Sequence, residues 1–235
     1  MVSEKPPPDA KKVLVIMAHP DDAELSSAGT LIKWIAKGCQ VRYIICTTGD
    51  KGTKEAKMTP FQLAEIREKE QREAASVLGI TGLTFLRHAD GELEYNAVFR
   101  NEIALLIRKF QPEIIITHDP WRPYQLHPDH RAVGFSTVDA VIVARDHLFL
   151  PALLELELPA HAPLELYFTF PSTPDYVVDI TDVIEKKLEA LEKHQSQLKS
   201  IPDWREKIKL MSSKLAEGKQ FHYAESFKRL VLTYQ

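Results

Sequence analysis

Cysteine is scarce in this chain of 235 residues, which contains only Cys39 and Cys46. The two flank one predicted strand, and seven extended residues span ~23 Å, far beyond the Cα separation that a disulfide tolerates. We therefore expect both thiols to be reduced, which fits a cytoplasmic protein. A chain of this length buries roughly 70% of its unfolded surface, so neither disulfides nor a structural metal are needed to stabilise it.

Strong charge of one sign is also absent, because 30 Lys and Arg oppose 33 Asp and Glu, for a net charge of −3. Proteins that bind nucleic acid or anionic lipid through charge need a concentrated positive surface, so we expect no nucleic-acid partner. The longest early apolar run, residues 13–18, is far too short to cross a bilayer. The residues before it lack the apolar core of a signal peptide. We expect no integral membrane segment and a flexible lead-in over residues 1–11.

Short apolar runs alternate with amphipathic segments along the first part of the chain. Continuous or nearly continuous apolar runs, typical of strands buried on both faces, occur at 13–18, 41–47, 83–86 and 113–117. Amphipathic helices are predicted over 23–37, 60–78, 97–110 and 128–144. This alternation predicts an α/β, Rossmann-like fold, a mainly parallel sheet with helices on both faces, as a single domain over residues 1–235.

The pattern changes after Pro151. Strands are predicted at 165–170 and 176–180, followed by an amphipathic helix over 182–199. The last ~35 residues are predicted to be helical.

Two of the predicted strands end in side chains that can bind a metal. Residues 13–18 continue into His19-Pro20-Asp21-Asp22-Ala23-Glu24. The strand at 113–117 leads into His118, which lies close enough to support a site, and then into His127-Pro128-Asp129-His130. Ligands bind at the carboxyl ends of the strands in open α/β sheets, where the first and fourth strands are commonly neighbours. We therefore expect the two motifs to converge.

The spacing within each motif suits a metal site. His19 and Asp22 are three residues apart across a strand-to-helix turn, and Pro128 in the first helical position places His127 and His130 around the first turn. Two imidazoles and one carboxylate leave a coordination position open for water, as catalytic zinc requires. Asp21 and His127 would then be neighbours of the metal, suited to general-base chemistry and to protonating an amine or stabilising an oxyanion.

The two motifs, residues 18–24 and 127–130, resemble those of the PIG-L/LmbE-like family of zinc-dependent N-deacetylases. The resemblance extends over most of the chain and includes residues 65–70, 112–117 and 187–197. It implies an LmbE-like fold and Zn²⁺, or another divalent metal, as the cofactor. The metal ligands that it implies are His19, Asp22 and His130.

The resemblance also implies catalytic roles for Asp21 as general base and for His127 as acid or oxyanion stabiliser, oriented by Asp129. An adjacent carboxylate of this kind would raise the pKa of His127 and favour a charged imidazolium. The side chains expected to bind substrate are Arg67, Glu24, Tyr124 and His194. The implied reaction removes acetyl from an N-acetylglucosamine-type amino sugar, and the implied assembly is a homo-oligomer, a trimer or a hexamer.

Other functions fit the residues less well. A deacetylase or amidase acting on a non-sugar N-acyl substrate uses the same site. A non-haem iron oxygenase also binds its metal through two histidines and one carboxylate, but Asp21 and His127 favour hydrolysis. A dinucleotide-binding module needs a G-x-G-x-x-G turn, and the acidic residues at 21–24 would instead repel a pyrophosphate. A non-catalytic metal-binding protein would be expected to use four protein ligands.

Overall fold

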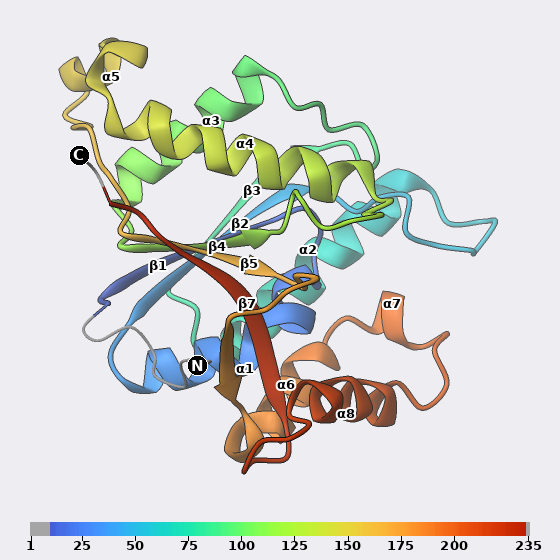
Figure 1. Cartoon of the computed structure of the whole chain (residues 1–235). Helices are drawn as coiled ribbons and strands as arrows, with labels where there is room; N and C mark the ends of the chain where they lie inside the picture. The colour runs from blue at the N-terminus through green and yellow to red at the C-terminus, as the bar shows by residue number, and fades with distance from the viewer. Residues whose placement is uncertain (1–9, 234–235) are drawn as a thin grey trace.

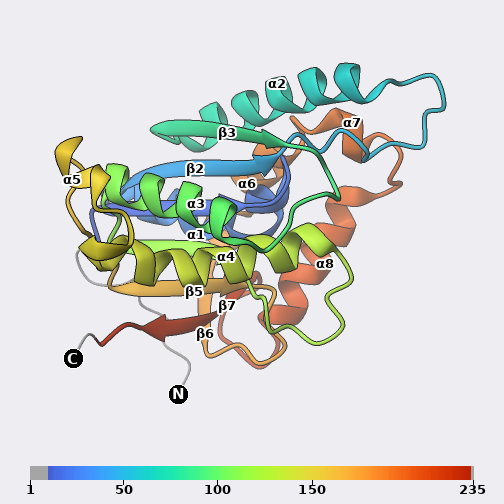
Figure 2. The same cartoon turned by 90° about the horizontal axis from the view of Figure 1, so that it is seen from above.

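The computed structural model describes residues 10–233, so residues 1–9 of the expected flexible lead-in lie outside the described part of the chain. It contains a seven-stranded sheet in the order β3-β2-β1-β4-β5-β7-β6, which Figure 2 shows from above. The strands are β1 (Lys12–Met17), β2 (Gln40–Thr47), β3 (Gly82–His88), β4 (Ile114–His118), β5 (Glu165–Thr169), β6 (Tyr176–Asp179) and β7 (Ala224–Val231). The first five pair in parallel, whereas β7 is antiparallel to both β5 and β6. The mainly parallel sheet predicted from the sequence, with β1 beside β4, is confirmed.

Helices cover both faces of this sheet, with α3 and α4 on one side and α1 and α6 on the other (Figure 1). The helices are α1 (Asp22–Ala36), α2 (Pro60–Leu78), α3 (Ala97–Phe110), α4 (Pro128–Arg145), α5 (Ala152–Glu155), α6 (Ile184–Leu191), α7 (Gln195–Leu198) and α8 (Trp204–Leu215). Two short 3₁₀ turns, η1 (His147–Phe149) and η2 (Thr181–Val183), follow α4 and precede α6. Within residues 10–233, no helix combines the length and the apolar character needed to cross a membrane.

Strand β1 shows why the sheet needs two helical layers. Its alternate residues Val13, Val15 and Met17 belong to the core beneath α1, whereas Leu14 and Ile16 belong to the core beneath α3 and α4. Each of these side chains is at most 1% exposed. Burying an aliphatic side chain of this size contributes about 1.5–3 kcal/mol, so exposing either face would be costly. The continuous apolar run of β1 is therefore explained by burial on both faces.

A glycine sets the position of α4 at the carboxyl end of the sheet. A Cβ atom added to Gly134 would lie 2.8 Å from the backbone oxygen of His118 and 2.9 Å from Cβ of Pro120. The helix therefore packs directly on the end of β4, at a distance that only glycine permits. This contact holds the N-terminal half of α4 against the end of β4.

Two predictions for the C-terminal part of the chain were wrong. The helix expected over 182–199 is divided into η2, α6 and α7, with a break at residues 192–194. The last residues were expected to be helical, but only α8 is a helix there, and residues 224–231 form β7. Strand β7 pairs with β5 and β6, whose residues lie well before it in the chain, and such pairing overrides local preference.

Candidate metal centre

The first part of the site is the turn between β1 and α1. The backbone amide of His19 donates to Asp22 Oδ2 at 2.8 Å, so the carboxylate lies back over the turn. His19 is 6% and Asp22 9% exposed. Between them Asp21 is the N-cap residue of α1 and has φ 99°, a left-handed conformation that is strained for a residue with a Cβ. The turn therefore directs His19 and Asp22 to the same side, as their spacing predicted.

The second part of the site is the start of α4. His127 is the N-cap residue and Pro128 occupies the first turn, so His130 lies one turn further along. Nε2 of His130 lies 3.1 Å from Nδ1 of His19, although the two residues are 111 positions apart in sequence. The predicted convergence of the two motifs is confirmed.

Three side chains at this point, His19, Asp22 and His130, have donor atoms at separations close to those around a tetrahedral metal ion. Asp22 Oδ2 lies 3.2 Å from His19 Nδ1, and Asp22 Oδ1 lies 3.5 Å from His130 Nε2. Ligands at the usual zinc distances of about 2.0–2.2 Å lie roughly 3.3–3.6 Å apart in a tetrahedron. Two imidazole nitrogens 3.1 Å apart, each with a lone pair to share, also need a proton or a cation between them. The residues present therefore fit a divalent metal.

Asp129 and Asp90 fix the orientation of the His19 ring. Oδ2 of Asp129 and Oδ1 of Asp90 each lie 3.1 Å from Nε2 of His19. Backbone amides of Gly91 and Leu93 donate to Asp129 at 2.7 and 3.2 Å and hold its carboxylate in place. When a carboxylate accepts the Nε2–H of an imidazole, the Nδ1 lone pair faces the metal, and the ligand becomes more basic. The sequence did not single out Asp90, although it lies two residues past β3 at the same edge of the sheet.

The electrostatics of the cluster favour a buried positive charge. Burial opposes protonation of His19, but hydrogen bonds with Asp129, Asp22 and Asp90 outweigh it and raise its pKa to about 11. Burial also opposes ionisation of Asp22, yet the neighbouring His130 and His118 hold its pKa well below the usual range. Burial lowers the pKa of His130 to about 3, so this imidazole is neutral, as a metal ligand must be. A divalent cation would satisfy the same carboxylates that now surround His19.

Two neighbouring groups of potential ligands are less suitable. Nε2 of His118 lies 3.3 Å from Asp22 Oδ2, but it accepts a hydrogen bond from the Ala18 amide at 3.1 Å. A nitrogen that accepts this bond has already used its lone pair. The second group consists of His19, Asp90, His127 and Asp129. Asp129 already accepts backbone amides there, so it is better suited to orienting His19 than to binding a metal.

Asp21 lies beside the cluster and is supported by Arg67. The guanidinium NH2 of Arg67 approaches Asp21 Oδ2 at 3.3 Å and also donates to the Pro20 carbonyl. Burial raises the pKa of Asp21 to about 6, against the opposing effect of Arg67. Arg67 is 4% exposed and donates from NH1 to the Gly49 carbonyl at 2.9 Å. It was expected to bind substrate, but the structure places it behind Asp21, in contact with the backbone.

His127 is the most exposed histidine of the cluster, with 41% of its side chain accessible. Its ring centroid lies 4.4 Å from that of His19 and 4.8 Å from that of His130. Burial and the nearby His19 lower the pKa of His127, although Asp129 acts in the opposite direction. The expectation of a raised pKa is therefore corrected, because Asp129 makes its hydrogen bond to His19.

The remaining residues expected to bind substrate lie in very different surroundings. Tyr124 is 96% exposed, on the loop between β4 and α4, with φ 60°. Glu24 and His194 have no exposed surface, and Nε2 of His194 lies 3.4 Å from Glu24 Oε2. Both side chains are buried against each other in this structure, and their role in binding substrate stays a prediction.

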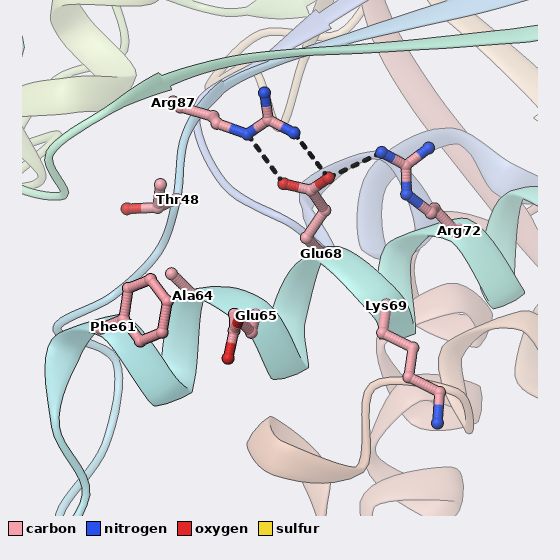
Figure 3. Close-up of a pocket in the computed structure, with 8 residues that line it drawn as sticks. All are labelled: Thr48, Phe61, Ala64, Glu65, Glu68, Lys69, Arg72 and Arg87. Carbon is pink, nitrogen blue, oxygen red and sulfur yellow. Dashed lines mark hydrogen bonds and ion pairs between the residues drawn. The ribbon is translucent and has the colours of Figure 1, made fainter.

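A separate pocket of about 560 Å³ lies on the outer side of α2 (Figure 3). It is lined by Thr48, Phe61, Ala64, Glu65, Glu68, Lys69, Arg72 and Arg87. Glu68 accepts hydrogen bonds from Arg72 at 2.6 Å and from Arg87 at 2.9 and 3.1 Å, which the dashed lines in Figure 3 mark. Helix α2 thus presents Glu68 to this pocket and Arg67 to Asp21, and the pocket is distinct from the metal cluster.

The strand ends bring the imidazoles of His19 and His130 and the carboxylate of Asp22 together, beside a further carboxylate, Asp21, and a half-buried histidine, His127. The protein is therefore one of the α/β proteins with a candidate metal site at the carboxyl edge of a mainly parallel sheet. A family model described as PIG-L, GlcNAc-PI de-N-acetylase, matches residues 14–141, which is more than half of the chain. The chain belongs to the PIG-L family, and the resemblance predicted from the two motifs is confirmed.

Named relatives agree with this assignment. The chain is 39% identical over 189 residues to the diacetylchitobiose deacetylase of Thermococcus kodakarensis, covering 80% of this chain and 71% of the relative. It is 32% identical to a probable N-acetyl-alpha-D-glucosaminyl L-malate deacetylase 2 of Bacillus cereus, covering 85% of this chain and 90% of the relative. The solved structure of N,N'-diacetylchitobiose deacetylase from Pyrococcus horikoshii superimposes with a TM-score of 0.90 at 34% identity, covering 95% of this chain and 85% of the other.

Proposed function

We propose that this protein is a metal-dependent N-deacetylase that hydrolyses the acetamide group of an N-acetylglucosamine-type amino sugar. The observation that carries the proposal is the convergence of one nitrogen each from His19 and His130, 3.1 Å apart, on the Asp22 carboxylate, whose two oxygens lie 3.2 and 3.5 Å from them. Relatives with substantial identity are named for deacetylation of N-acetylated sugars. The exposed His127 beside the three donors leaves the site open to a substrate on that side.

The metal would be held by His19, Asp22 and His130. When bound, a divalent metal supplies Lewis-acid polarisation of water and of an acyl oxygen. The carboxylates of Asp129 and Asp90 keep His19 in the ring orientation that this role requires. We propose zinc as the metal, because two imidazoles, one carboxylate and one free position are a common catalytic zinc set.

Asp21 is the general base in this proposal. Its carboxylate accepts a proton from the attacking water, whose oxygen forms the new bond to the acetyl carbon. Arg67 holds one carboxylate oxygen at 3.3 Å and the preceding carbonyl, so the base is fixed in position before substrate arrives. The carbon–nitrogen bond then breaks, and the proton taken by Asp21 passes to the departing nitrogen. Acetate and a free amine are the products, and the protons balance with one group acting as both base and acid.

His127 is placed to donate a hydrogen bond to the acetyl oxygen as negative charge develops on it. It is the exposed member of the cluster, and its ring lies against both His19 and His130. The loop that leads to it carries two exposed aromatic residues, Trp121 at 57% and Tyr124 at 96%. Trp121 packs edge-on against Phe135 and Phe168, so its ring is fixed, and it can form a wall for the sugar.

The test is a panel of acetylated compounds incubated with the purified protein, with release of acetate and of the free amine both measured. N,N'-diacetylchitobiose, N-acetylglucosamine and an N-acetylglucosaminyl malate represent sugars, and an N-acetylated amino acid represents the non-sugar alternative. Equal amounts of acetate and amine from at least one sugar are expected. Release from the amino acid alone would replace the sugar deacetylase with an amidase.

Two further expectations extend the proposal. Assembly as a trimer or hexamer is supported by exposed leucines around η1 and α5, where Leu148 is 78% and Leu156 66% exposed. Light scattering on the purified protein tests this assembly. A cytoplasmic location agrees with the two free thiols, Cys39 and Cys46, and is tested by fractionating the source cells.

A further inference from the structure

A group of buried polar side chains that the proposed reaction does not use lies between α1, α2 and the start of α7. Glu24, Gln71 and His194 are all 0% exposed. Buried polar groups of this kind cost free energy unless they are paired, so their arrangement needs a physical explanation. They come from three segments that are far apart in sequence.

The contacts form a chain that starts at the backbone of Asp21. The Asp21 amide donates to Oε1 of Gln71 at 3.0 Å, and Nε2 of Gln71 donates to Oε1 of Glu24 at 2.9 Å. The other Glu24 oxygen lies 3.4 Å from Nε2 of His194. Gln71 therefore bridges the amide of the base and Glu24, and Glu24 faces His194.

Glu70, the residue before Gln71 on α2, connects the His194 end of this series of contacts back to α2. Glu70 accepts hydrogen bonds from the backbone amide of Ser196 at 2.7 Å and from its hydroxyl at 2.6 Å. The backbone carbonyl of His194 accepts from the amides of Gln197 and Leu198, both at 3.0 Å, so α7 begins directly at His194. Helix α2 thus contacts the turn of Asp21 through Gln71 and the segment that follows His194 through Glu70.

We call this set of contacts the ring; it consists of Gln71, Glu24, His194, Ser196 and Glu70. The ring contacts Asp21 and can therefore influence its backbone conformation. A residue with a Cβ at φ 99° is strained and persists only where the surrounding contacts determine its conformation. The Asp21 amide makes its contact with the ring, through Gln71. Glu24 can hold Gln71 in place only if the negative charge of its buried carboxylate has a partner nearby. His194 is the group that faces this carboxylate. Burial alone would lower the pKa of His194, but the facing Glu24 carboxylate raises it overall.

We propose that His194 is a positioning residue for the reaction, which through Glu24 and Gln71 holds the Asp21 backbone in its left-handed conformation and aims the general base. The inference rests on the proposed deacetylation for its effect on turnover. The effect on the turn at Asp21 does not depend on any substrate. His194 touches neither metal nor substrate in this account and acts only through the ring.

The experiment compares two substitutions of similar size. His194→Met fills the buried space without a polar group, whereas His194→Gln keeps an N–H donor at a similar reach toward Glu24. Gln195→Ala is the matched control, because Gln195 is the exposed neighbour on the same short helix. For each variant, hydrogen–deuterium exchange of residues 18–25, bound metal, kcat and KM are measured.

We expect faster exchange over residues 18–25 in His194→Met, and a kcat about 10- to 100-fold lower with KM and metal content unchanged, because the base is misaimed. His194→Gln should recover most of both losses, and Gln195→Ala should match the parent. Unchanged exchange and kcat in His194→Met would overturn the proposal, as would a kcat loss that tracks metal loss.

A further variant, Ser196→Ala, removes one of the two hydrogen bonds to Glu70 at a half-buried position, and it keeps the test decisive if His194→Met fails to fold. Faster exchange over residues 18–25 supports the ring, and unchanged exchange in this variant overturns it. If the parent protein deacetylates no sugar but the exchange result holds, the proposed function fails and the ring stands. If the parent is active and exchange is unaffected, the ring alone fails.

Discussion

The two parts of the chain on either side of residue 146 contribute to the site in different ways. Among residues 10–233, the side chains grouped as potential metal ligands all come from the first part, between His19 and His130. The second part adds β5, β7 and β6 to the sheet and packs α6 against α1, as Figure 1 shows. The first part therefore carries the proposed metal ligands, and the second part packs against α1, which begins at one of them.

Side chains of the second part form hydrogen bonds directly with the backbone of α1. Glu225 of β7 accepts the backbone amides of Gly29 and Thr30, in the middle of α1, at 2.9 and 2.7 Å. Lys187 of α6 donates to the carbonyl of Leu25 at 2.8 Å and to Glu225 at 2.7 Å. These are side-chain bonds to a helix backbone, and both charged groups are buried. We conclude that α1, which begins at the proposed ligand Asp22, is held along its first half and middle by these two side chains.

The difference teaches that a short motif can specify ligands, whereas their placement depends on distant residues. His19 and Asp22 are recognisable within one turn of the chain. The groups that fix the helix carrying Asp22, namely Lys187 and Glu225, are more than 160 residues away along the chain. Substitutions of the proposed catalytic residues in the first part should therefore change the reaction at constant stability, whereas substitutions of Lys187 or Glu225 in the second part should change stability.

The largest effect that separates the two parts is expected for Lys187→Met. Removing one partner of a buried ion pair leaves Glu225 unpaired, and such losses cost about 3–5 kcal/mol of the free energy of unfolding. Chemical denaturation measures this loss, with Lys186→Met, an exposed neighbour on α6, as the control. A variant as stable as the parent would show that the second part does not hold α1 in the way described.

The next effect is expected for Asp21→Asn, which tests the chemistry assigned to the first part. The amide cannot accept a proton from water, so kcat should fall by ~10²-fold or more with metal content and stability unchanged. Steady-state kinetics with metal analysis on the same sample measure both quantities. Asp182→Asn, in the exposed pair with Lys33, serves as the control. Normal turnover in fully loaded Asp21→Asn would rule out the base.

A smaller effect is expected for Asp129→Asn, which sharpens the account of how His19 is oriented. Losing the carboxylate at Nε2 of His19 should weaken metal affinity by about 10- to 100-fold, the usual result when a group behind a ligand is removed. Competition with a metal-binding dye measures the affinity. If affinity is unchanged while kcat falls, Asp129 acts on His127, as the sequence suggested, and the contact with His19 is secondary.

The sequence predicted the first part of the molecule well because its signals are local. The run at 13–18, the cap residues before α2 and α4, and the two His/Asp motifs each lie within a few residues. The parallel order then followed from the alternation of strands and helices, and it brought His19 and His130 together.

The remainder could not be predicted because it depends on pairing and burial across the chain. Nothing local in residues 224–231 distinguishes β7 from a helix, and its partners β5 and β6 decide its conformation. Asp90 is an ordinary carboxylate in sequence, and only the position of β3 in the sheet brings it to His19. Glu24 and His194 belong to family-like motifs, which suggested contact with substrate, but the packing of α2 and α7 buries both.

The central claim is that a metal held by His19, Asp22 and His130 makes this protein a deacetylase. The most direct measurement is metal content and acetate release from N,N'-diacetylchitobiose for the parent and for His130→Ala, before chelation, after chelation and after adding Zn²⁺ back. The account predicts about one metal per parent chain, loss of activity on chelation and recovery with Zn²⁺, and neither metal nor activity in His130→Ala, with His147→Ala matching the parent. Full activity in the chelated parent, or full metal content in His130→Ala, would contradict it.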